Sequence, residues 1–155
     1  MMNFYSCFCK VPGLYPQDRP SIGALQSNIR SLAKNHDKLI IFLRELGHNF
    51  SLIGLSETKI KLGEDSLSNI DLHGYRFLSQ PGQSNAGGVG LFVQKDLKLS
   101  VRNELSVSDC KFEALWVDIA LSNQKIICAI VYQYPNASLE IFTDYPYASL
   151  HHSLY

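Results

Sequence analysis

The chain has 155 residues, of which 46% are hydrophobic and 18% are charged, and its formal net charge is zero. This length fits one domain with a sizeable core, and this composition is typical of a globular chain rather than a disordered one. A chain without net charge has no general attraction for polyphosphates, so any contact with nucleic acid needs a local basic face.

The N-terminus and the cysteines exclude two further classes. The apolar patch Asn3–Cys9 is too short to span a membrane and has no basic residues before it, so we expect neither a signal peptide nor a membrane contact. The expected location is intracellular, in the nucleus or the cytoplasm, and the protein is not secreted. Four cysteines (Cys7, Cys9, Cys110 and Cys128) are scattered through the chain. Cys7 and Cys9 lack metal-binding spacing and are predicted to be free thiols, and Cys128 is predicted to be a small buried hydrophobic residue.

Residues 1–20 contain several prolines and no hydrophobic period, which predicts an irregular leader outside the fold. Ser21–Asn28 is predicted to be the first strand, with the polar Asn28 at its end. Asn35–Gly47 then has the signals of an amphipathic helix. Asn35 is a candidate N-cap, Asp37 lies in the first turn, and Gly47 is a natural stop. The apolar face of this helix consists of Leu39, Phe42, Leu43 and Leu46.

The stretch Ser51–Lys59 predicts a strand that is buried on both faces and ends abruptly at Glu57. If this strand returns parallel to the first, Asn28 and Glu57 lie at the same edge of a sheet. A carboxylate held there is a suitable ligand for a hard cation such as Mg²⁺. The alternative is a charge that merely ends a strand.

The second half of the chain reads as a succession of strands. They are predicted at Gly74–Ser79, Gly87–Val93, Leu97–Val101, Phe112–Ala120 and Lys125–Tyr132. In the fourth of these, Phe112, Ala114, Trp116 and Asp118 alternate with Glu113, Leu115, Val117 and Ile119. The fifth is wholly apolar and is followed by polar groups at Tyr132, Tyr134 and Asn136. The glycine-rich strand Gly87–Val93 has no lysine of the kind found in a phosphate-binding loop. Its glycines are therefore predicted to allow close packing between sheets.

Four ordered blocks carry a resemblance to a known family. They are Asn-Ile-Arg-Ser-Leu (28–32), Leu-Ser-Glu-Thr-Lys (55–59), Gly-Gly-Val-Gly-Leu-Phe-Val (87–93) and Val-Tyr-Gln-Tyr-Pro-Asn-Ala-Ser (131–138). Over about residues 21–142 the chain resembles the endonuclease/exonuclease/phosphatase superfamily, and most of all the apurinic/apyrimidinic-type endonuclease domain of LINE-like (non-LTR) retrotransposons. The resemblance implies an α/β fold, a DNase-I-like four-layer α/β/β/α sandwich. It also implies a Mg²⁺- or Mn²⁺-dependent phosphodiesterase site and a DNA partner that is nicked to prime reverse transcription.

The same resemblance assigns roles to single residues. Glu57 resembles the metal-ligating glutamate, and Asn28 resembles the asparagine that arranges the metal site and the phosphate. Tyr132 resembles the tyrosine that hydrogen-bonds the scissile phosphate, and Asn136 the asparagine that follows it. The alternative is a turn residue at Asn28, an amphipathic strand end at Tyr132 and a loop asparagine at Asn136.

Two departures from the family pattern limit what is expected. Arg30 stands where many members have an acidic or amide residue, and neither Gly-Asp-Phe-Asn nor Ser-Asp-His occurs. His151-His152 has no acidic residue just before it. We therefore expect a domain truncated before its C-terminal half, with residues 143–155 as an unrelated or disordered tail.

Three interpretations remain. The chain is a truncated DNA endonuclease that is inactive alone, or a non-catalytic pseudoenzyme or interaction fragment, or a phosphatase or exonuclease of another branch. The blocks at 28–32 and 131–138 favour the retrotransposon branch over the last of these.

Overall fold

The computed structural model describes residues 3–7, 22–61, 70–83, 85–121 and 125–137. The proposed tail at residues 143–155 lies outside them. One helix and nine strands make up the described part of the chain. In chain order they are β1 (Asn3–Cys7), β2 (Ala24–Asn28), α1 (Leu32–Leu46), β3 (Leu52–Ser56), β4 (Tyr75–Gln80), β5 (Val89–Gln94), β6 (Lys98–Val101), β7 (Val107–Ser108), β8 (Phe112–Ala120) and β9 (Lys125–Gln133).

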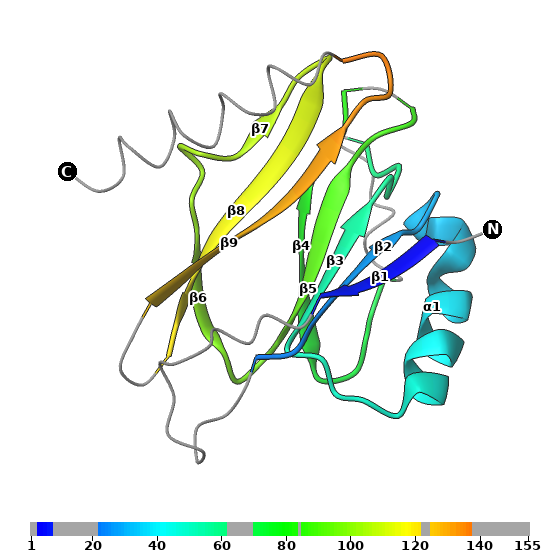
Figure 1. Ribbon diagram of the computed structural model, residues 1–155, viewed down its shortest axis with the longest axis vertical. Coiled ribbons are helices and arrows are strands. Elements are labelled where there is room, and N and C mark those ends of the chain that lie inside the picture. The colour runs from blue at the N-terminus through cyan, green and yellow to red at the C-terminus, as the bar shows by residue number, and fades with distance from the viewer. Residues whose placement is uncertain (1–2, 8–21, 62–69, 84, 122–124, 138–155) are drawn as a thin grey trace.

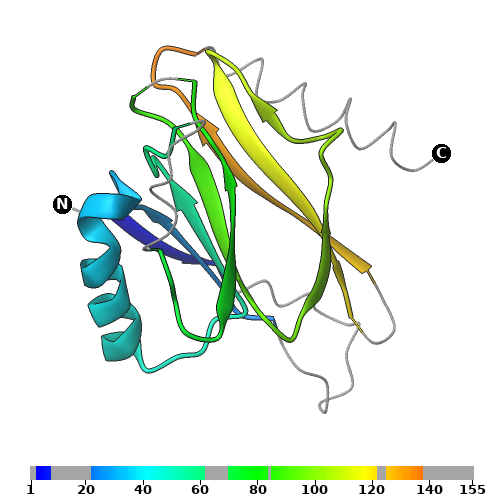
Figure 2. The ribbon, with the colours of Figure 1, turned by 180° about the vertical axis from the view of Figure 1, so that it is seen from behind.

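The strands form two sheets that pack face to face, and α1 covers the outer face of the first (Figures 1 and 2). The first sheet has the order β1-β2-β3-β5-β4. In the second, β6 and β7 pair with β8, which also pairs with β9 along its full length. The described residues thus form α/β/β layers, which confirms the predicted α/β class. No described helix is both long and apolar enough to cross a lipid bilayer.

The βαβ unit expected at the start of the domain is present. β2 and β3 are parallel neighbours, and Asn28 pairs in register with Ser56. The expectation of an irregular leader needs correction, because Asn3–Cys7 forms β1 and pairs antiparallel with β2. Hydrophobic periodicity is the main signal from which a strand is predicted, and this short segment lacks it. Its pairing with β2 is made by backbone groups, which the sequence does not reveal.

The start of α1 differs from the prediction. The helix begins at Leu32 rather than at Asn35, and no side chain caps it. Instead, the amide of Ser31 donates to Glu57 O at 2.8 Å, and the amide of Leu32 donates to Thr58 O at 2.9 Å. Backbone carbonyls from a distant segment satisfy donors that a capping side chain would otherwise satisfy.

The rest of α1 follows its pattern with one exception. Gly47 ends the helix in the left-handed conformation (φ 59°) and its amide donates to Arg44 O, as predicted. Leu39 is fully buried, and Phe42 and Leu43 pack on the core, whereas Leu46 is 45% exposed. With its start at Leu32, α1 has no acidic residue in its first turn, so the predicted position of Asp37 is also wrong.

One hydrophobic core lies between α1 and the first sheet, and a second lies between the two sheets. Leu115, Val117 and Ile119 of β8 face inward, and the alternating Phe112, Ala114 and Trp116 form a separate cluster on the outer face. Gly54 of β3 lies directly under Ile130 of β9, where a Cβ would stand 2.4 Å from Ile130 Cδ1. A glycine is therefore what lets the two sheets approach at this point. Among the described cysteines, Cys110 and Cys128 are free thiols.

Candidate metal and phosphodiester site

Three polar side chains meet at one end of the sandwich. β3 and β9 belong to different sheets, and their carboxyl ends point to the same end of the molecule (Figure 1). Asn28 ends β2, Glu57 follows β3 directly, and Tyr132 lies near the end of β9. The two sheets thus bring Tyr132 into contact with Glu57, which precedes it by 75 positions in the sequence.

Glu57 is the centre of this group. Asn28 Nδ2 donates to Glu57 Oε1 at 2.6 Å, and the Tyr132 hydroxyl donates to the same oxygen at 3.3 Å. The amide of Arg30 donates to Asn28 Oδ1 at 3.2 Å, which fixes the orientation of the Asn28 amide group. Among the described residues no hydrogen bond occupies Glu57 Oε2, so this oxygen remains available to a ligand.

The environment keeps Tyr132 neutral. Burial, followed by the negative charge of Glu57 and the hydrogen bond to it, raises the pKa of Tyr132 to about 12. A tyrosine with such a pKa holds its proton at all physiological pH values and acts as a neutral hydrogen-bond donor.

The backbone at this end of the sheet is strained. Arg30, Ser31, Glu57 and Lys59 all have positive φ angles, between 51° and 111°. Each such conformation costs a non-glycine residue roughly 1–3 kcal/mol, and such residues cluster at functional sites. The paired segments after β2 and β3 hold them in place, through bonds such as Ile29 N to Ser56 O at 3.0 Å.

A second carboxylate lies beside this group and was not singled out from the sequence. Glu113 of β8 is fully buried and accepts hydrogen bonds from the amide of Gly88 and, at 2.5 Å, from the Tyr134 hydroxyl. The rings of Tyr134 and Tyr132 meet edge to face at 5.2 Å. The signal was present in the sequence, because Glu113 is the charged member of an otherwise apolar inward face.

The remaining predicted site residue is placed differently. Asn136 lies exposed in the turn after β9, in which the amide of Ala137 donates to Tyr134 O. Among the described residues no contact joins Asn136 to Glu57. Arg30, the departure from the family pattern, is exposed and enters the group through its backbone only.

The donor set fits a hydrated hard cation. The described residues contain no cluster of three or more acidic, histidine or cysteine side chains. Mg²⁺ keeps several waters and is often held by only one or two carboxylates. The free Oε2 of Glu57, steadied through Oε1 by two neutral donors, suits such a ligand.

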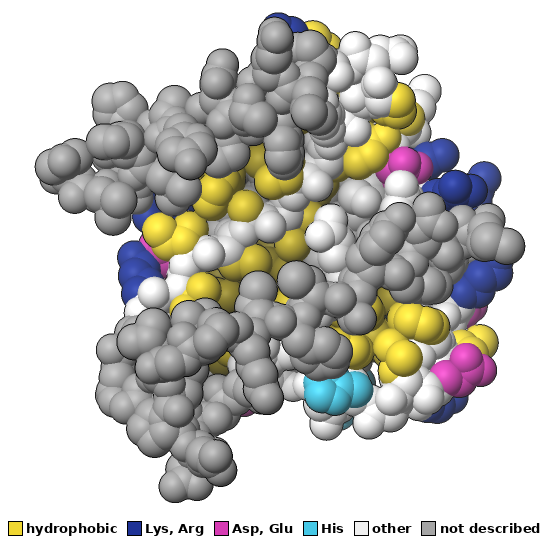
Figure 3. All heavy atoms as spheres, viewed as in Figure 1, with side chains coloured by type: hydrophobic (Ala, Val, Ile, Leu, Met, Phe, Trp, Pro, Cys, Tyr) yellow, Lys and Arg dark blue, Asp and Glu magenta, His cyan; other side chains and the backbone are white. Residues whose placement is uncertain are grey.

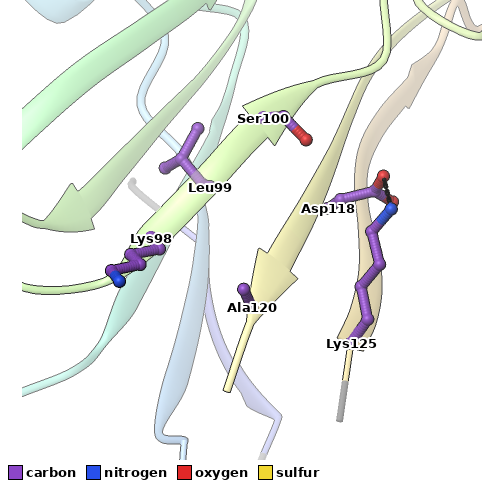
Figure 4. Close-up of a pocket in the computed structure, with 6 residues that line it drawn as sticks. All are labelled: Lys98, Leu99, Ser100, Asp118, Ala120 and Lys125. Atoms are coloured by element: carbon purple, nitrogen blue, oxygen red, sulfur yellow. Dashed lines mark ion pairs between the residues drawn. The ribbon is translucent and has the colours of Figure 1, made fainter. Parts of the chain in front are cut away.

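A separate hollow of about 220 Å³ lies on β6, β8 and β9, at the start of β9 and so far from Tyr132 (Figure 4). Its carboxylate is already neutralised, because Asp118 pairs with Lys125 at 2.5 Å and with Arg102 at 3.3 Å. Burial raises the pKa of Asp118, but the hydrogen bonds and charges of Lys125 and Arg102 outweigh it and keep the pKa below its ordinary value. The charged residues around this hollow therefore form a structural network of ion pairs.

Comparison with known proteins gives the fold. No family model matches the chain, and no curated protein matches its sequence. Among solved structures, the chain is similar to the endonuclease domain of TRAS1, a telomere-specific non-LTR retrotransposon. The two share 16% identity over 83% of this chain and 54% of that one, with a TM-score of 0.57.

A second similar structure is the AP endonuclease LMAP from Leishmania major. Here the identity is 18% over 68% of this chain and 38% of that one, with a TM-score of 0.52. The chain spans about half the length of the TRAS1 domain and less of LMAP. Over the part that it spans, the chain therefore has the same mixed α/β fold as these two endonucleases, which confirms the predicted DNase-I-like fold class.

Proposed function

We propose that this chain is part of a divalent-metal-dependent DNA endonuclease domain of retrotransposon type. The observation that carries the proposal is the Asn28–Glu57–Tyr132 group, which assembles at the end of a fold shared with endonucleases. In this proposal Glu57 holds Mg²⁺ or Mn²⁺ through Oε2. The bound cation would neutralise negative charge on a phosphodiester.

The other two residues act as neutral donors. Asn28 fixes the rotamer of Glu57 through its amide nitrogen. Tyr132, with its raised pKa, offers its hydroxyl proton to a non-bridging phosphate oxygen when DNA is bound. Neutral donors add hydrogen bonds to the phosphate without cancelling the charge of the cation.

The described residues near the group also supply a local basic face. Arg30, Lys59 and Lys61 are exposed, and they flank Asn28 and Glu57 in sequence. We expect them to contact the DNA backbone. Replacing Lys59 and Lys61 by alanine should make the negative slope of log affinity against log salt shallower, by about 0.9 per lost contact with duplex DNA. Replacing Lys95 and Lys98 by alanine is the matched control and should leave the slope unchanged, because both are exposed and lie near the start of β3, at the end opposite to Glu57.

Metal binding tests the assignment of Glu57 directly. Mn²⁺ added to isotope-labelled protein should broaden the amide signals of residues around Glu57, and Glu57→Gln should abolish this broadening. The control is Glu45→Gln on α1, which removes an exposed carboxylate elsewhere. If the broadening is weak, uniform along the chain and equal in Glu57→Gln and Glu45→Gln, Glu57 does not bind the cation. That result would favour a non-catalytic fragment over an endonuclease.

Catalysis is a separate question. The sequence contains no Gly-Asp-Phe-Asn or Ser-Asp-His, so no aspartate–histidine pair of the family type activates water. General acid–base help is worth about 10²–10⁴-fold. We therefore expect the chain alone to leave supercoiled plasmid intact in Mg²⁺. Metal-dependent nicking that disappears in Glu57→Ala would overturn the expected inactivity and establish the endonuclease.

A further inference from the structure

We propose that Glu113 is a positioning residue for Glu57, a role that rests on the function proposed above. The buried Glu113 carboxylate is placed to lock two glycine-containing segments against the chain that follows β3. Glu113 Oε2 accepts from the Gly88 amide and Oε1 accepts from the Tyr134 hydroxyl at 2.5 Å. One buried side chain thus ties β5 to the end of β9.

The backbone of two glycines, Gly82 and Gly87, closely approaches this carboxylate. A Cβ at Gly87 would stand 2.2 Å from Glu113 Oε1, and a Cβ at Gly82 would stand 2.7 Å from the same oxygen. Both distances are far below normal contact, so only glycine lets the backbone close around the carboxylate at either position. A Cβ at Gly87 would also stand 2.1 Å from the Tyr134 hydroxyl oxygen, so Gly87 is needed for the contact between Glu113 and Tyr134.

The same glycine segment holds the residues after Glu57. The amide of Thr58 donates to Gly88 O at 3.0 Å, and the amide of Lys59 donates to Gly87 O at 2.8 Å. Glu57 and Lys59 have φ angles of 53° and 58°, which an L-residue adopts only when its surroundings impose them. The chain of contacts runs from Glu113 to Gly88, from Gly88 to Thr58, and so to the direction of the Glu57 side chain.

Tyr134 provides a second connection. Its hydroxyl is held by Glu113, and its ring contacts the ring of Tyr132, whose own hydroxyl donates to Glu57. Glu113 therefore supports both the metal-binding carboxylate and the phosphate donor. Removal of a comparable supporting hydrogen-bond partner at metal sites typically weakens metal binding by about 10–100-fold.

The test compares two substitutions of Glu113. Glu113→Met keeps a long unbranched side chain but removes both acceptors. Glu113→Gln keeps one acceptor for the Gly88 amide and can donate to the Tyr134 oxygen, so it should rescue. The control is Asp118→Leu, which removes the other buried carboxylate of β8 from its opposite face.

The primary readout is the backbone carbon chemical shifts of Glu57 and Lys59 without metal, because these shifts depend on φ. Glu113→Met should move them away from left-handed values, whereas Glu113→Gln and Asp118→Leu should keep them. Retention of the native shifts in Glu113→Met, or an equal loss in Asp118→Leu, would overturn the proposal. If Glu113→Met does not fold, Tyr134→Phe tests the connection through Tyr132, and the same Mn²⁺ requirement as in the unchanged chain would then count against the proposal.

The second readout is Mn²⁺ broadening around Glu57. Glu113→Met should require about 10–100-fold more Mn²⁺ than the unchanged chain for the same broadening. If the unchanged chain shows no site for Mn²⁺, the proposed function fails, while the carbon shifts still test the positioning role. The two failures are thus distinguishable.

Discussion

At the scale of single residues, Tyr132 and Glu57 act as a pair whose two properties are linked. Glu57 raises the pKa of Tyr132, and Tyr132 in turn helps to hold one oxygen of Glu57. Among the described residues no hydrogen bond reaches its second oxygen, Oε2. These two hydrogen bonds to Oε1 distinguish Glu57 from a charge that merely ends a strand, and under the proposed function Oε2 is the oxygen that binds the cation.

The pair predicts a shift in titration. Glu57→Gln should lower the pKa of Tyr132 from about 12 toward 10, although burial, its largest cause, will keep it above 10. The measurement is the absorbance of tyrosinate against pH, with Tyr132→Phe identifying the late step among the tyrosines. An unchanged late step in Glu57→Gln would show that the charge of Glu57 has no influence on Tyr132.

The same shift predicts a loss of stability at alkaline pH. Tyr132 has its raised pKa in the folded chain only, so the unfolded chain releases this proton first, at about pH 10. The contribution of protonated Tyr132 to the free energy of unfolding is complete below pH 10 and is lost as the pH rises to about 12. Urea unfolding at pH 9, 10 and 11 (roughly spanning the ordinary tyrosine pKa) should show a steeper decline for the unchanged chain than for Tyr132→Phe.

At the scale of elements, the contact between Gly54 and Ile130 sets the distance between the sheets. Gly54→Ala should destabilise the fold by about 1–3 kcal/mol, because its Cβ meets Ile130 Cδ1 at 2.4 Å. Ile130→Val removes that methyl group and normally costs about 0.5–1.5 kcal/mol. In the Gly54→Ala background it should cost less or even stabilise. Additive free energies of unfolding would disprove the contact.

The end of α1 gives a second prediction at this scale. Gly47 has φ 59° and nothing lies within 4 Å of the position of a Cβ, so the penalty for a side chain is conformational alone. Gly47→Ala should lower the free energy of unfolding by about 1–2 kcal/mol. Gly47→Asn should cost less, since asparagine tolerates this conformation. Equal losses for the two variants in urea unfolding would argue against a left-handed helix end.

Sequence patterns predicted the elements well where a local signal exists. The bounds of β8 were predicted as Phe112–Ala120, and the alternation of its faces is confirmed. β1 and the two-residue β7 were missed, because edge strands and short strands carry little hydrophobic period. The start of α1 was missed because backbone carbonyls of Glu57 and Thr58, not a local side chain, define it.

At the scale of the whole molecule, the convergence of Asn28 and Glu57 could be predicted because parallel neighbours end at the same edge. The approach of Tyr132 depends on how one sheet stacks on the other, which the family resemblance implied and no local pattern encodes. The contacts of Glu113 could not be predicted from the sequence either, because they also depend on how the two sheets stack. Its partners are Gly88, which immediately precedes β5 of the first sheet, and Tyr134, which immediately follows β9 of the second sheet.

Within the part of the chain that the structure describes, β9 is an edge strand of the second sheet. Among the described residues β9 pairs only with β8, and hydrophobic side chains gather across the middle of the face seen in Figure 3. Burial in this strand is uneven. Ile130 is only 7% exposed because it packs against Gly54, whereas Ile126 and Ile127 are only half-buried.

This open edge predicts that the isolated chain associates. Fully burying an isoleucine is worth about 1.5–3 kcal/mol, and total stability is typically about 5–15 kcal/mol, so partial losses at Ile126 and Ile127 matter. An unpaired apolar strand edge also invites pairing with another chain. Ile127→Lys should shift the chain from large species toward monomer in light scattering, because a charge on an edge strand opposes such pairing. Ile41→Lys, the same change at an exposed position of α1, should have no such effect. A monodisperse, cooperatively unfolding monomer for the unchanged chain would show that the edge of β9 is covered in solution.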